Sequence, residues 1–164
     1  MSIKSTSGAH AAANLAEGSI FGSVEIAAPP ERVFRALTTK EVIDWWIRPG
    51  VFHTTGWTGD VRVGGRRRAV GTGNGRPFTL EGEFLEINMP RKLVLTWHEG
   101  GAPGKPTTVT FLLERIDGGT HLTLEQMGFA APDWCMNTCL GWETSFERLG
   151  ELLLAEATPG LART

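Results

Sequence analysis

The chain has 164 residues, of which 41% are hydrophobic and 21% charged, and its formal net charge is −2 at neutral pH. These values describe one ordinary globular domain whose core needs neither disulfides nor metals. They exclude a strongly basic surface for nucleic acid, and no segment approaches the ~18 consecutive apolar residues of a membrane-spanning helix.

The N-terminal residues 1–18 are mostly small and polar, without a sustained apolar period. We therefore expect a flexible arm there, followed by a single domain over residues 19–157 and a tail over residues 158–164. The arm lacks the unbroken apolar core of a secretion signal, so the expected location is the cytoplasm.

The domain is predicted to begin with a strand and two short helices. Partly alternating apolar residues predict a strand over residues 20–28. Two prolines end this strand and suit the first turn of a helix over residues 31–37. A second short helix is expected over residues 40–46.

The central part of the chain predicts an antiparallel meander. Residues 50–58 are interpreted as a loop or an irregular strand. The strand candidates that follow cover residues 59–72, 77–88, 92–98, 107–116 and 120–127. Hairpin turns are signalled by Asn74-Gly75 and by either Asp117-Gly118 or Gly118-Gly119, and hairpins join antiparallel neighbours.

Residues 132–156 form the one segment long enough for a long helix. Its apolar stripe at steps of three and four consists of Trp134, Thr138, Gly141, Trp142, Ser145, Leu149 and Leu152. Gly141 costs roughly 1 kcal/mol relative to alanine inside a helix, so we infer that something packs closely against it. Because large aromatic residues interleave with small and polar ones, we interpret the segment as a helix over a sheet with incomplete filling between them.

Taken in order, these segments resemble a known family. The stretches that carry the resemblance are I-A-A-P-P-E-R-V-F-R-A-L-T, V-I-D-W-W, G-D-V-R-V-G-G-R, T-L-E-G-E-F-L-E-I, R-K-L-V-L-T-W, T-V-T-F-L-L-E, G-G-T-H-L-T-L and the G-W pair of the last helix. Over roughly residues 20–155 the chain resembles the SRPBCC (START/Bet v 1-like) superfamily, in the AHSA1-like branch similar to the C-terminal domain of the Hsp90 ATPase activator.

The resemblance implies an α+β helix-grip fold. A curved antiparallel sheet of about six or seven strands would wrap round the long C-terminal helix, with two short helices after the first strand and a cavity between sheet and helix. Members of the superfamily bind lipids, hormones, polyketides or other apolar molecules, and some are enzymes. The chaperone activator has a further N-terminal domain where this chain has a short arm, which argues against a full co-chaperone.

The resembled fold also nominates residues for contact with a ligand. The candidates are Trp57, Phe84, Trp97, Trp134, Thr138 and Trp142, together with His53 in the loop at the cavity mouth. No spacing distinguishes these aromatic residues from ordinary core residues, so the nomination rests on the fold.

Other polar residues offer weaker candidates. His98 ends a strand, and Glu81 and Glu83 share one strand face, where they are interpreted as solvated. Arg66 and Arg68 share a face opposite to Arg67. We interpret the run as a solvated edge with salt bridges, and the alternative is contact with an anionic ligand through one inward arginine.

The cysteines and histidines do not predict a metal site. Cys135 and Cys139 lie four residues apart on one helix, where a disulfide would distort the backbone, and no second ligand pair is apparent. We expect two reduced, buried thiols, no metal and no cofactor.

The sequence therefore predicts a protein that binds a small hydrophobic or amphipathic molecule between sheet and C-terminal helix. One alternative is an enzyme of the same fold, of the cyclase or hydrolase type, that uses the cavity and acts through His53, His98 or an inward glutamate. A second alternative is an interaction protein that modulates an Hsp90-type chaperone, and a homodimer is left open.

Overall fold

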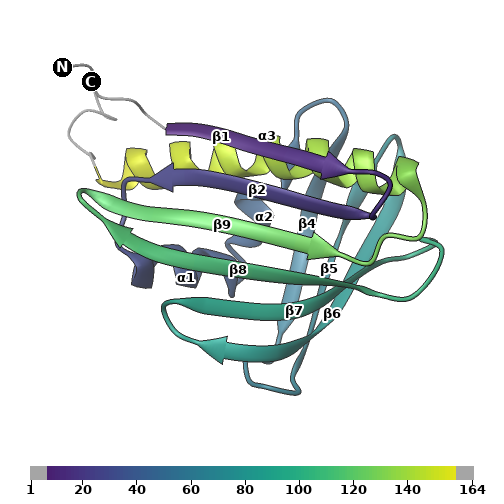
Figure 1. Cartoon of the computed structure of the whole chain (residues 1–164), viewed down its shortest axis with the longest axis horizontal. Helices are drawn as coiled ribbons and strands as arrows, with labels where there is room; N and C mark the ends of the chain where they lie inside the picture. The colour runs from purple at the N-terminus through teal and green to yellow at the C-terminus, as the bar shows by residue number, and fades with distance from the viewer. Residues whose placement is uncertain (1–6, 158–164) are drawn as a thin grey trace.

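The computed structural model describes residues 7–157 and shows a curled sheet closed by one long helix (Figure 1). The strands are β1 (Ser7–Asn14), β2 (Ser19–Ile26), β3 (Ile47–Arg48), β4 (Phe52–Gly59), β5 (Arg66–Gly73), β6 (Arg76–Asn88), β7 (Lys92–Glu99), β8 (Thr107–Ile116) and β9 (Gly119–Met127). The helices are α1 (Pro30–Leu37), α2 (Val42–Trp45) and α3 (Pro132–Ala157). The expected α+β helix-grip fold is confirmed. The first six residues of the arm expected over residues 1–18, and the tail expected over residues 158–164, lie outside the described residues.

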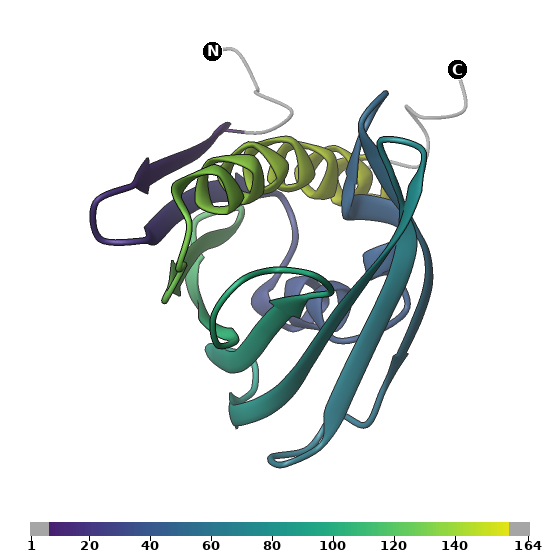
Figure 2. The same ribbon diagram turned by 90° about the vertical axis from the view of Figure 1, so that its right-hand side faces the viewer.

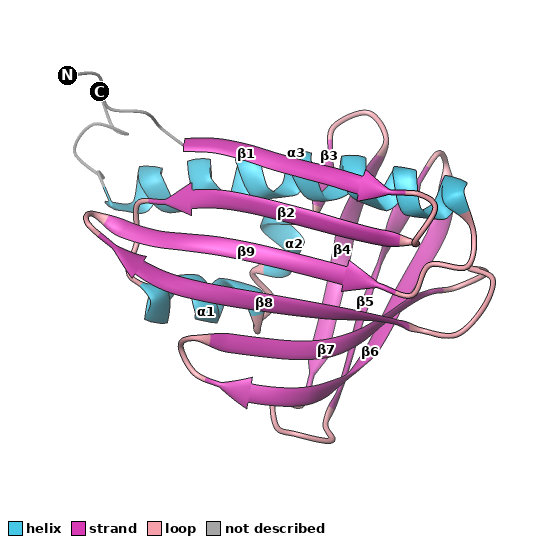
Figure 3. Ribbon diagram, viewed as in Figure 1, coloured by secondary structure: helices cyan, strands magenta, loops and turns pink. Residues whose placement is uncertain are grey.

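The strands form one antiparallel sheet in the order β1-β2-β9-β8-β7-β6-β5-β4-β3 (Figure 3). Each strand from β3 to β8 pairs with its successor, and β2 pairs with β9, so that β1 and β3 are the two edge strands of the sheet. At the β5–β6 hairpin, Asn74 and Gly75 have φ of 52° and 77°, the positive values that a type I′ turn requires. The predicted meander is confirmed.

The sheet has nine strands, not the expected six or seven. Residues 7–14, expected to belong to a flexible arm, instead form β1. Alternate alanines of β1 pack partly buried against the core, and the Ala11 amide donates to the Glu143 carboxylate at 3.2 Å. Alanine has a low propensity for strands, so the alternation of buried and exposed alanines does not predict a strand from the sequence. The other additions are β4, expected as a loop or irregular strand, and the two-residue β3.

Helix α3 lies across the open side of the curled sheet (Figure 2). Its buried residues are Cys135, Cys139, Gly141, Trp142, Ser145, Phe146, Leu149, Gly150 and Leu153. A Cβ atom on Gly141 would lie 3.3 Å from the Phe52 ring and 3.5 Å from the Trp46 ring. The close packing inferred for this glycine is thus confirmed. No helix within residues 7–157 is long and apolar enough to cross a membrane.

The short helices lie beside the middle and the C-terminal end of α3, where Trp45 of α2 contacts Trp142. Arg32 of α1 donates to Glu156 at 2.6 Å, which places α1 beside the C-terminal end of α3. The opposite end of α3, which begins at Pro132, faces strand ends and connecting loops (Figure 1).

Candidate functional site

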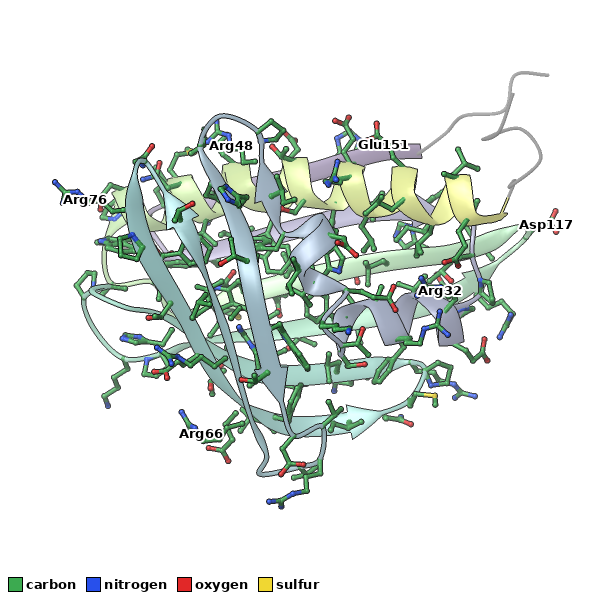
Figure 4. All side chains as sticks on the ribbon, turned by 180° about the vertical axis from the view of Figure 1, so that it is seen from behind. Arg32, Arg48, Arg66, Arg76, Asp117 and Glu151 are labelled. Carbon is green, nitrogen blue, oxygen red and sulfur yellow. The ribbon has the colours of Figure 1, made fainter. Side chains whose placement is uncertain are left out.

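A cavity of about 600 Å³ lies between the N-terminal half of α3 and one end of the sheet. We call it the α3 cavity. Its walls come from α3, the β3–β4 connection, the β5–β6 hairpin and the end of β7. Arg48 and Arg76 line it and lie at the same end of the molecule (Figure 4). The volume is within the range of about 300–1,000 Å³ that is typical of small-molecule sites.

The floor of the α3 cavity is apolar. Trp46 and Leu80 are buried, and Phe52 and Phe78 are half-buried against the core. The Phe52 ring centroid lies 5.2 Å from that of Trp46 and 6.1 Å from that of Phe78, the latter edge to face. Strand alternation turns Phe78 and Leu80 inward together from β6. An apolar ligand group would find an aromatic surface here.

The rim of the α3 cavity is polar. Its polar lining residues are Arg48, Asn74, Arg76, Glu99, Asp133, Asn137 and Thr138. Asn74, Arg76, Asp133 and Asn137 are exposed, so these groups can meet both water and a bound molecule. An apolar floor with a polar rim suits a molecule that is itself amphipathic.

The sequence model of the family described as activator of Hsp90 ATPase homolog 1-like protein matches residues 27–154. The chain belongs to the activator of Hsp90 ATPase homolog 1-like family. This membership confirms the resemblance to the SRPBCC-type branch. Among proteins with a curated functional description, none matches the chain.

Solved structures of the same half-barrel shape support the family assignment. Protein CV1439 from Chromobacterium violaceum is 27% identical, with a TM-score of 0.71 over 84% of this chain and 97% of that chain. Protein MLL2253 from Mesorhizobium loti is 28% identical, with a TM-score of 0.66 over 85% and 98% of the two chains. Protein Ms6760 from Mycobacterium smegmatis, 20% identical, has a TM-score of 0.74 over 92% and 99%, and shows the fold alone.

Two of the residues that the sequence nominated for ligand contact line the α3 cavity of this protein. Trp134 and Thr138 lie on its helix side, half-buried. Trp97 lines a smaller neighbouring cavity of about 20 Å³, which also touches Trp134 and Thr138. Phe84 and Trp142 are 1% and 0% exposed and lie in the core.

The other two nominated residues lie outside both cavity linings. His53 is exposed on the outer face of β4, where its ring nitrogens lie 3.5 Å from the Thr72 hydroxyl. Trp57 is half-buried against the core, with its ring beside Gly59. Residue parity on β4 explains the outward direction of His53, because Phe52 and Thr54 on either side of it face inward.

Sequence reasoning missed several residues of the α3 cavity. Phe52 and Phe78 belong to strands whose inward faces are known only once the sheet is curled. Glu99 was overlooked because it follows the end of a predicted strand. Glu81 and Glu83 lie on the parity opposite to the buried Leu80 and thus face away from the concave side.

Glu99 is a partly desolvated titratable group of the α3 cavity. It is half-buried, lines both cavities, and its pKa is raised above the ordinary value of 4.5 by burial. The folded protein therefore binds the Glu99 proton more tightly than the unfolded chain does. Protonated Glu99 therefore contributes to the stability of the fold at pH values below its ordinary pKa. This contribution is lost as the pH rises through the raised pKa of Glu99 in the folded protein.

We expect Glu99→Gln to raise the melting temperature at pH 7.5 by about 1–3 °C, because an ionised, partly desolvated carboxylate is removed. Thermal unfolding from pH 4 to pH 8 should show this gain shrinking towards acid. Glu125→Gln on the exposed face of β9 is the control. An equal gain for Glu99→Gln at pH 4 and pH 7.5 would contradict the argument.

The cysteines are unpaired thiols in the packed part of α3. Both are buried, the Cys135 thiol faces the Ser19 carbonyl at 3.6 Å, and burial raises the pKa of both thiols. Such thiols are poor nucleophiles because the thiolate is disfavoured. Within residues 7–157, no three His, Cys, Asp or Glu side chains are placed to share a metal ion.

Proposed function

We propose that this protein binds a small apolar or amphipathic molecule in the α3 cavity. The observation that carries the proposal is a cavity of about 600 Å³ whose floor is made by Trp46, Phe52, Phe78 and Leu80. Burial of apolar ligand surface supplies about 25 cal/mol per Å², before the cost of association is subtracted. The polar rim supplies partners for polar groups of the ligand.

The proposal includes a cytoplasmic location and no bound cofactor. The unpaired, buried Cys135 and Cys139 support a reducing compartment. The family membership supports a ligand-binding cavity without naming the ligand.

Two measurements test the proposal. Native mass spectrometry of freshly purified protein should detect a co-purified small molecule. The neutral fluorescent probe N-phenyl-1-naphthylamine should bind with one site, quench the fluorescence of Trp46 or Trp134 and raise the melting temperature. At a free probe concentration of 100 times Kd, binding adds about 2.7 kcal/mol to the free energy of unfolding. Absence of a co-purified molecule, of quenching and of stabilisation together would overturn the proposal.

A further inference from the structure

Arg67 is the middle of three consecutive arginines and the one that turns into the protein. Its exposed fraction is 6%, whereas Arg66 and Arg68 are exposed. Figure 4 shows Arg66 pointing away from the body of the molecule, and Arg68 pairs with Glu81 at 3.5 Å on the outer face. Strand alternation on β5 produces this division. The inward guanidinium therefore needs a separate explanation.

The guanidinium of Arg67 has few partners. Its carbon lies 4.4 Å from the centre of the Trp97 ring, and its Nη1 donates to the Leu80 carbonyl over a long 3.4 Å. Nη2 is buried without a hydrogen-bond partner among residues 7–157, and no carboxylate in that part of the chain forms an ion pair with it. A guanidinium offers five N–H donors, so most of its hydrogen-bonding capacity is unused.

Burial of an unpaired cation is unfavourable. The half-buried Arg32, by contrast, is paired with Glu41 at 2.7 Å and with Glu156 at 2.6 Å. For Arg67, burial lowers the pKa to about 10, so the side chain is still charged at neutral pH. An isolated buried charge of this kind is destabilising unless a counter-ion reaches it.

The side chain of Arg67 runs towards the α3 cavity. Arg67 pairs with Gly82 on β6, and its Nε lies 3.5 Å from where a Cβ of Gly82 would be. Its Nη1 donates to the backbone carbonyl of Leu80. Leu80 is the next inward-facing residue of β6 after Gly82 and lines the α3 cavity. Since Gly82 has no side chain, nothing from that position separates Arg67 from Trp97. The guanidinium thus lies behind the floor formed by Leu80.

We propose that Arg67 is the counter-ion of a carboxylate head group on the ligand of the α3 cavity. This inference rests on the proposed ligand binding. The carboxylate would accept hydrogen bonds from Nη1 and Nη2 together, the geometry that a planar guanidinium favours. Arg67 does not itself line the cavity, so the head group reaches the guanidinium when the Leu80 side chain, which does line it, moves aside. The apolar chain of the acid then occupies the aromatic floor.

The test compares decanoate with 1-decanol, which share chain length and differ in charge. Isothermal titration at pH 7.5 should show that decanoate binds the wild-type protein at least about tenfold more tightly, as expected for a buried charge-assisted hydrogen bond. Arg67→Met should remove this preference while 1-decanol binding is kept, and Arg67→Lys should keep part of it. Arg66→Met, which removes a neighbouring exposed charge, should leave the preference unchanged.

A second readout separates ligand recognition from a purely structural role of Arg67. Arg67→Met should raise the melting temperature of the ligand-free protein, because an unpaired buried charge is removed. A lower melting temperature would mean that the contacts with Trp97 and Leu80 hold the fold, and would overturn the inference. Equal binding of decanoate and 1-decanol to the wild-type protein would also overturn it while leaving the ligand cavity intact. If neither molecule binds, both the inference and the proposed function fail.

Discussion

Replacement of Trp142 by alanine is expected to lower the free energy of unfolding by about 3–5 kcal/mol. Trp142 is fully buried on α3. Its ring centroid lies 4.6 Å from that of Trp46, 5.0 Å from that of Trp97 and 5.4 Å from that of Phe146. Truncation would leave a void between helix and sheet that these rigid rings cannot fill. Urea unfolding followed by far-UV circular dichroism measures the loss as a shift in the midpoint.

Part of this loss comes from a buried hydrogen bond. The Trp142 indole donates to Gln126 Oε1 at 2.8 Å, and Gln126 Nε2 donates in turn to the Thr107 hydroxyl at 2.8 Å. Trp142→Phe keeps an aromatic ring but leaves Gln126 without its donor, which should cost about 1–3 kcal/mol. The double variant Trp142→Phe with Gln126→Met should recover some of that cost. A loss below about 1 kcal/mol for Trp142→Ala would show that the centre of the core is not packed as described.

The second large effect is expected from Thr138→Phe. Thr138 is half-buried on α3 and lines both the α3 cavity and its small neighbour. A phenyl ring at this position would occupy space that the ligand needs, so the affinity for N-phenyl-1-naphthylamine should fall at least about tenfold. The melting temperature should change little, since the ring enters an open cavity and not packed core.

Met136→Phe is the matched control for Thr138→Phe. Met136 lies on the same helix, is 39% exposed and lines neither cavity. Fluorescence titration should give this variant the wild-type affinity for the probe. Unchanged affinity in Thr138→Phe would place the binding site elsewhere, and equal losses in both variants would point to a general effect on α3.

Much of the fold could be predicted from local signals. Asn74-Gly75 identified the β5–β6 hairpin because a type I′ turn needs positive φ at both central residues. Gly141 indicated close packing on α3 because glycine is costly inside a helix, and the rings of Phe52 and Trp46 are what packs there. The predicted order of elements held because each depended on a period or a turn within a few residues.

Strand β1 could not be predicted in the same way. Its inward residues are alanines, which bury too little area to produce a recognisable period. Their packing against α3, and the bond from Ala11 to Glu143, join residues that are 132 positions apart. Only the folded chain supplies that partner.

The sequence by itself determined the family, the antiparallel meander, the amphipathic α3 and the opposite direction of Arg67 from its two neighbours. The tertiary structure alone decided which face of each strand is concave, and hence that Arg67 turns inward while His53 turns outward. It also gathered Phe52, Phe78 and Glu99 beside the N-terminal half of α3. The physical reason is that the period of a strand determines which residues share a face. The curvature of the sheet and the position of the helix determine which of the two faces is buried.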